Sequence, residues 1–255
     1  MAVTLDEAPG KAGLLIVSGG NEIRSGAHRG MARLAAAVAA AGYPVLRFDR
    51  RGVGDSEGEN RGFEHSGEDI AAALALFREI CPHLTRVTAF GNCDAATALL
   101  LHHRRGGPDA LLLANPWTID APLGEGEANA LPPPAAIRAR YIAKLKDPRE
   151  WVRLLRGGVD LRKLVRGLRS ARRTAPASNL AERLRQAMGW IDVPISVLIA
   201  ARDTTATAFM AHWQTTFRNE CDNIWLQSLD SASHGFADVE ARTWLEKRML
   251  EALRG

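Results

Sequence analysis

Short apolar runs alternate along the chain with longer segments in which apolar residues recur every three or four positions. Such a run is typical of a buried strand, and the longer period is typical of a helix that packs one face on a core. The runs predict strands at residues 14–18, 44–48, 87–90, 111–114, 195–200 and 224–229. Helices are expected at residues 28–41, 66–80, 93–103, 206–219 and 236–253. This alternation predicts an α/β fold with a mostly parallel central sheet and helices on both faces.

Residues 119–191 break the alternation, because they contain no convincing strand. A connection with three consecutive prolines, at 132–134, leads into several helical pieces rich in arginine and leucine. This pattern predicts a helical lid at 119–191, inserted into a core made of residues 1–118 and 192–255. Between residues 138 and 173, thirteen arginines and lysines face only three acidic residues. Two interpretations stay open: a solvated helical face, or a surface for an anionic partner such as a carrier protein.

Composition sets the class of protein. The 255 residues are 46% hydrophobic and 24% charged, which is typical of a soluble globular chain, and the net charge of +4 is too small to indicate nucleic-acid binding. Cys81, Cys93 and Cys221 are odd in number and widely spaced, which fits neither a disulfide framework nor a zinc site. No uncharged apolar run approaches the roughly 20 residues of a membrane-spanning helix. We therefore expect a cytoplasmic protein without metal or cofactor, and the sequence predicts no oligomeric state.

Candidate chemistry lies directly after the strand expected at 87–90. Residues 91–95, Gly-Asn-Cys-Asp-Ala, match the nucleophile elbow pattern G-x-S-x-G, with cysteine in place of serine and alanine in the last position. The elbow is a sharp strand-to-helix turn, so residues two before and two after the nucleophile must be small. A thiol at the start of a helix is also favoured as the reactive thiolate. Cys93 is thus a candidate nucleophile, although a buried structural cysteine is the alternative.

A base and an acid follow in the chain order expected for such a site. Asp203 follows the strand at 195–200, and His234 follows the last strand, at 224–229. Because parallel sheets build their sites at the carboxyl ends of strands, we expect these residues to meet Cys93. His234 would accept the thiol proton and Asp203 would orient the ring. Asp203 could instead be only a helix N-cap, and Asp120 is the substitute acid.

A tetrahedral anion in acyl transfer also needs backbone N–H donors. The amide of Asp94 is one candidate, and the loop after the first strand offers a second at Gly20 or Asn21, between which the sequence does not decide. The glycine-rich loop at 48–58 is interpreted as scaffold whose charges pair internally. Three more residues are predicted to line the substrate pocket: His28, Trp117 and Tyr141.

These segments together resemble a known family. The loop at 48–58 looks like that of α/β-hydrolases generally, and the chain resembles more narrowly the hydrolases associated with the bacterial exosortase A protein-sorting system. That narrower resemblance is carried by Gly19, Gly20, Arg24, Gly26, His28 and Arg29, by residues 91–96 and 115–117, and by the basic segment. It spans about residues 13 to 254. It implies an α/β-hydrolase fold and a bacterial cytoplasmic enzyme linked to exopolysaccharide and protein-sorting gene clusters, with no established substrate. The N-terminal strands of the fold are expected to be absent or very short here.

The sequence therefore predicts a hydrolase with a Cys93-His234-Asp203 triad, acting on a small or carrier-bound ester or thioester through an acyl-thioenzyme. An acyltransferase that uses the same intermediate is the first alternative. A protein that binds a small molecule without catalysis, or in which Cys93 senses redox state, is the second.

Overall fold

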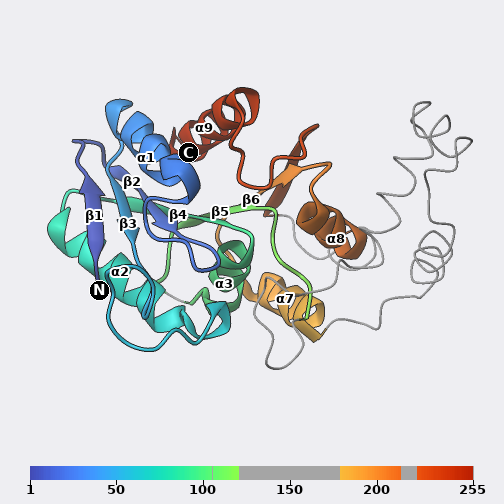
Figure 1. Ribbon diagram of the computed structural model, residues 1–255. Helices are drawn as coiled ribbons and strands as arrows, with labels where there is room; N and C mark the ends of the chain where they lie inside the picture. Colours follow the sequence, from blue (N-terminus) through green and yellow to red (C-terminus); the bar gives the residue numbers. More distant parts are fainter. Residues whose placement is uncertain (105, 121–178, 214–222, 255) are drawn as a thin grey trace, which may run out of the picture.

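The computed structural model describes residues 1–104, 106–120, 179–213 and 223–254. A mixed sheet of seven strands lies at the centre of this part of the chain (Figure 1). The strands are β1 (Val3–Asp6), β2 (Ala12–Val17), β3 (Val45–Phe48), β4 (Arg86–Asn92), β5 (Ala110–Ala114), β6 (Ile195–Ala200) and β7 (Ile224–Leu229). They lie in the order β1-β3-β2-β4-β5-β6-β7. Only β1 pairs antiparallel with its neighbour, and every other pair is parallel. The six strands predicted from the apolar runs are confirmed.

Helices cover both faces of the sheet, as the alternating pattern predicted (Figure 1). They are α1 (Gly30–Ala40), α2 (Gly67–Ile80), α3 (Asp94–His102), α7 (Asn179–Trp190), α8 (Thr204–His212) and α9 (Val239–Arg254), with short 3-10 turns at Ala27–Arg29 and Phe63–His65. Helices α1 and α9 pack together on one face, whereas α2, α3 and α7 pack on the other. Helix α1 begins later than predicted because His28 and Arg29 take left-handed backbone angles, which an α-helix excludes.

The strand β2 shows how the two faces arise from the sequence. Leu15 and Val17 belong to the apolar cluster under α2 and α3, while Leu14 and Ile16 belong to the cluster under α1 and α9. All four side chains are almost completely buried. A parallel strand covered on both faces needs apolar residues at consecutive positions, which explains the uninterrupted apolar runs of this sequence.

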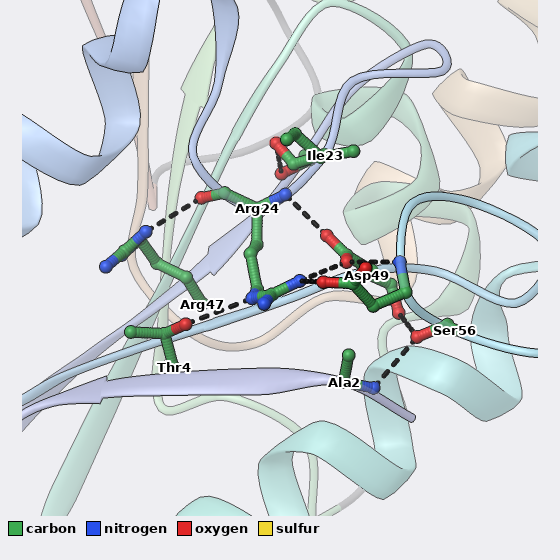
Figure 2. A network of polar contacts seen from close by, with 9 residues as sticks. Ala2, Thr4, Ile23, Arg24, Arg47, Asp49 and Ser56 are labelled. Atoms are coloured by element: carbon green, nitrogen blue, oxygen red, sulfur yellow. Dashed lines mark hydrogen bonds and ion pairs between the residues drawn. The ribbon is translucent and has the colours of Figure 1, made fainter.

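The edge strand β1 is four residues long and is tied to the rest of the sheet by polar contacts (Figure 2). The fully buried Asp49 accepts hydrogen bonds from the backbone and side chain of Arg24. Arg24 Nε also donates to Thr4 Oγ1 on β1 at 3.0 Å, and Arg47 Nη1 donates to the Arg24 carbonyl at 3.0 Å. The network joins β1 and β3 to the loop after β2. The internal pairing predicted for the charges of residues 48–58 is wrong, because their ion pairs are with residues outside the loop. Asp49 and Asp55 pair with Arg24, while Arg50 pairs with Asp94 and Arg51 with Asp69.

Most of the predicted lid lies outside the described residues, as does its basic segment at 138–173. Helix α7 falls inside the predicted range of 119–191, yet it packs against the core. Its residues Leu180, Leu184 and Met188 are buried in the same apolar cluster as α2 and α3. The sequence analysis assigned these apolar residues to the lid. In the structure, the carboxyl-terminal end of the range 119–191 packs on the core. Among the described helices, none is long and apolar enough to cross a membrane.

Candidate active site

The three residues proposed from the sequence as a triad follow the carboxyl ends of three parallel strands. Cys93 follows β4, Asp203 lies three residues after β6, and His234 lies in the loop between β7 and α9. Because β4, β5, β6 and β7 run parallel, these ends share one edge of the sheet. Cys93 and His234 line the same cavity at that edge.

Cys93 occupies a sharp turn between β4 and α3. Its backbone angles are φ 61° and ψ −124°, a conformation that non-glycine residues rarely adopt. The turn is held by the Cys93 amide, which donates to the Ala114 carbonyl at 2.9 Å. A Cβ on Gly91 would lie 2.7 Å from backbone atoms of Ala95 and Ala96, so β4 and α3 approach too closely for any side chain there. The small residues that the elbow pattern demands are therefore required by contact between strand and helix.

His234 and Asp203 form a hydrogen-bonded pair. His234 Nδ1 lies 3.1 Å from Asp203 Oδ2, and the same carboxylate oxygen accepts from the Ala206 amide at 3.0 Å. Burial alone would raise the pKa of Asp203, but the hydrogen bonds from His234 and Ala206 outweigh it, and the pKa lies below its ordinary value. The bond to Asp203 raises the pKa of His234 above its ordinary value, although partial burial opposes this. Asp203 therefore both caps α8 and orients the histidine.

The loop after β2 contacts the residue that follows Cys93. The Gly20 amide donates to Asp94 Oδ1 at 2.6 Å, and the buried Arg50 guanidinium contacts both the Gly20 carbonyl and Asp94 Oδ2, the latter at 3.5 Å. Asp94 is buried, so its negative charge requires a partner such as Arg50. The Asn21 side chain accepts from Asn60 at 2.7 Å. Gly20 lies on the cavity wall and Asn21 does not, whereas the Gly20 amide is engaged by the Asp94 carboxylate.

Asn115 is a residue at this edge to which the sequence analysis assigned no role. It directly follows β5, is completely buried and has φ 43°. Its Nδ2 donates to the His234 carbonyl at 3.0 Å and lies 3.4 Å from Asn92 Oδ1, while its Oδ1 accepts from the Ala200 amide at 2.8 Å. The sequence signal that could have indicated this residue is an asparagine directly after a buried strand. Asparagine tolerates left-handed backbone angles better than most residues, so it is suited to a sharp turn at a strand end.

The cavity at the site has a volume of about 370 Å³ and extends between α1 and α9. Of the predicted pocket residues, His28 lies on its wall, in a left-handed conformation. Trp117 packs against the apolar cluster under α2 and α3, and its amide donates to the Cys93 carbonyl at 3.3 Å. Tyr141 lies outside the described residues. Trp117 therefore contacts the elbow backbone and not the described part of the cavity wall.

Asp120, the substitute acid, has a different role in the structure. Its two carboxylate oxygens accept from the amides of Asn179 and Leu180, each at 3.0 Å. Asp120 thus caps the N-terminus of α7. Within the described residues, no group of three or more histidine, cysteine or acidic side chains is arranged to hold a metal ion.

The chain is similar to one protein-family model and to several solved structures. A family model described as "Alpha/beta hydrolase family" matches residues 14–245. No curated protein sequence matches the chain. Among solved structures, the esterase EaEST from Exiguobacterium antarcticum is 14% identical, with a TM-score of 0.62 over 99% of this chain and 95% of its own. Est1E from Butyrivibrio proteoclasticus, solved with ferulic acid, is 13% identical, with a TM-score of 0.62 over 100% and 96%.

A third solved structure, the esterase PF2001 from Pyrococcus furiosus, is 17% identical, with a TM-score of 0.60 over 98% of this chain and 82% of its own. At these identities the likeness concerns the fold. The described sheet and its flanking helices are those of an α/β-hydrolase fold.

Proposed function

Because this chain belongs to the α/β-hydrolase family, we propose that it cleaves ester or thioester bonds by acyl transfer to Cys93. The observation that carries the proposal is the His234–Asp203 hydrogen bond of 3.1 Å, on the edge of the sheet where Cys93 occupies the elbow. With Nδ1 bound to Asp203, His234 keeps Nε2 to accept the thiol proton. The positive end of α3, which begins at Asp94, favours the thiolate that results.

The reaction then proceeds in two steps. The Cys93 thiolate attacks the carbonyl carbon, and the tetrahedral oxyanion receives hydrogen bonds from the Asp94 amide and from the amide of Gly20 or Asn21. The Gly20 amide can serve only if it exchanges the Asp94 carboxylate for the oxyanion. The carbon–oxygen or carbon–sulfur bond to the leaving group breaks, and His234 returns its proton to that group. Water activated by His234 then attacks the thioester, releases the acid and restores the thiol.

Transfer to another nucleophile is the second candidate function. It is favoured by the cysteine itself, because a thioester intermediate is open to attack by amines and thiols as well as by water. We also propose that the chain is one of the exosortase A-associated hydrolases. It would then be a bacterial enzyme linked to exopolysaccharide and protein-sorting gene clusters. We propose further that a lid within residues 119–191 covers the site and that its basic segment binds an anionic partner.

The test is the mass of the intact protein after incubation with para-nitrophenyl acetate. One acetyl group is expected on Cys93, and Cys93→Ala is expected to lose the adduct and to lower turnover by at least about a thousandfold. Cys81→Ala is the matched control, because Cys81 is a free cysteine buried in the core, away from the cavity. Its adduct and turnover should equal those of the wild type. Full turnover by Cys93→Ala would refute the proposal.

Hydrolysis and transfer are then separated by the products. With an amine or alcohol acceptor present, an acyltransferase forms the acylated acceptor at a rate that rises with acceptor concentration. A hydrolase releases acetate at an unchanged rate.

A further inference from the structure

Two arginines stand on the wall of the cavity that contains Cys93 and His234. Arg33 lies in the first turn of α1 and Arg242 in the first turn of α9, the two helices between which the cavity extends. Within the described residues, neither side chain forms an ion pair or a hydrogen bond, whereas Arg24, Arg47, Arg50 and Arg51 all have acidic partners. Two arginines without acidic partners among the described residues therefore line one cavity, Arg33 exposed and Arg242 half-buried.

The rest of the wall adds little negative charge. Glu22 is the one acidic residue among the described residues that line the cavity, and one of its carboxylate oxygens accepts from the Ala27 amide at 3.2 Å. Helix α1 begins at Gly30 on this wall, with no side-chain cap and no acidic residue in its first turn. The amides of Gly30 and Ala32 donate to the carbonyls of Ala27 and Ser25, so the positive end of α1 adds to the potential of the arginines through its dipole.

The rest of the described wall is mostly apolar, and its other polar side chains besides Cys93 and His234 are Ser18, His28 and Asn92. Met31, Leu34, Phe90, Phe236 and Leu245 line the cavity, and all except Met31 are almost fully buried. A ligand that fits must therefore combine an apolar body with a negatively charged end. A wholly apolar ligand would leave the arginines unused, and a highly charged ligand would be desolvated against the apolar wall.

We propose that the cavity binds substrates in which an apolar segment links the ester or thioester bond to an anionic group of the size of a carboxylate, held by Arg33 and Arg242. The inference rests on the proposed function, because it names the substrate class for the same site. Arginine suits this role because its planar guanidinium can donate two parallel hydrogen bonds to one carboxylate. The anionic group can belong to the acyl part or to the alcohol part of the substrate.

The experiment compares matched pairs of neutral and anionic esters. For the acyl part, the mono-para-nitrophenyl ester of glutaric acid is compared with para-nitrophenyl butyrate. For the alcohol part, para-acetoxybenzoate is compared with its methyl ester. The wild type is expected to prefer the anionic member of at least one pair by about tenfold or more in kcat/KM, and the pair that shows this preference identifies which part carries the charge.

Arg33→Gln and Arg242→Gln are each expected to lower the ratio of anionic to neutral kcat/KM by about tenfold, since each removes one charge-assisted contact. Lys247→Gln is the control, because Lys247 is an exposed cation on α9 that does not line the cavity. It should leave the ratio unchanged. The inference is overturned if the wild type turns over the members of both pairs equally, or if Lys247→Gln lowers the ratio as much as the two variants do.

Failure of the inference can be distinguished from failure of the proposed function. If Cys93→Ala abolishes turnover of the neutral esters and no charge preference exists, only the substrate class is wrong. If Cys93→Ala retains turnover, the acyl-cysteine mechanism is wrong, whatever the charge preference.

Discussion

At the scale of single residues, Asn115 connects the segments that carry the three proposed catalytic residues. Its side chain contacts Asn92 before the nucleophile, the backbone of Ala200 before the acid, and the carbonyl of His234. Because it is completely buried, it does not touch substrate and can act only by positioning these segments. A hydrogen-bonded side chain of this kind fixes several strand ends relative to one another.

Asn115→Asp is expected to lower kcat by about tenfold or more and to leave KM within about twofold. Aspartate keeps the shape and the acceptor for Ala200, but it loses the donor to His234 and brings its own oxygen close to that carbonyl oxygen. The variant is also expected to lose about 1–3 kcal/mol of unfolding free energy. Steady-state kinetics and urea unfolding measure the two effects.

Asn223→Asp is the matched control for this prediction. Asn223 Nδ2 donates to the carbonyls of Ile191 and Val193, at 2.9 and 2.8 Å, next to the amino ends of β6 and β7 and far along both strands from the site. Asn223→Asp should lose an amount of unfolding free energy similar to that lost by Asn115→Asp, while its kcat stays at the wild-type value. A purely structural role for Asn115 would instead lower kcat equally in both variants.

At the scale of elements, the elbow depends on how closely α3 packs against β4. Gly91 allows that approach, and Ala95, Ala96 and Ala98 on α3 are completely buried. Small side chains let the helix axis come near the sheet. The strained angles of Cys93 are therefore maintained by packing between two elements and not by the local sequence alone.

Gly91→Ala is expected to destabilise the protein by about 1–3 kcal/mol, because its Cβ would overlap the backbone of α3. Gly189→Ala is the matched control. Gly189 lies in α7 with no atom within 4 Å of an added Cβ, so alanine should stabilise the protein by about 0.5–1 kcal/mol. Urea unfolding of both variants measures these changes. An unchanged midpoint for Gly91→Ala would contradict the packing argument.

At the scale of the whole molecule, folding brings His234 and Asp203 together from segments 31 residues apart, and their pairing makes stability depend on pH. The pKa of His234 is raised, so its contribution is full below its unfolded pKa of about 6.5 and is lost as pH rises through the higher folded value. The pKa of Asp203 is lowered, so its contribution is present above about 3.9 and is lost as pH falls through the lower folded value. The charged pair stabilises the fold between these limits.

A double-mutant cycle with His234→Gln and Asp203→Asn measures this pairing. The coupling free energy is expected to be largest near pH 5–6 and to decline above the raised pKa of His234. Asparagine still accepts the amide of Ala206, so the cap of α8 is retained in Asp203→Asn. A coupling that is constant between about pH 5 and pH 9 would contradict the assignment of the charge to His234.

Much of the fold and the positions of the candidate site follow from the sequence. Apolar runs and helical spacing predicted six strands and the layers around them, since both patterns reflect which faces a single element must bury. The elbow pattern and the order of Cys93, Asp203 and His234 along the chain placed three candidate residues at strand ends. These signals are local, so they can be read without knowing which elements are neighbours.

Only the tertiary structure decided the contacts between elements distant in sequence. It showed that Asp94 accepts a hydrogen bond from the Gly20 amide and that Asn115 donates one to the His234 carbonyl. It also showed that α7 packs on the core and that Arg33 and Arg242 line one cavity. The sequence determined which segments form strands, helices and turns, because each depends on neighbouring residues. Which polar groups meet at the site depends on strand order and helix packing, and neither is written in any one segment.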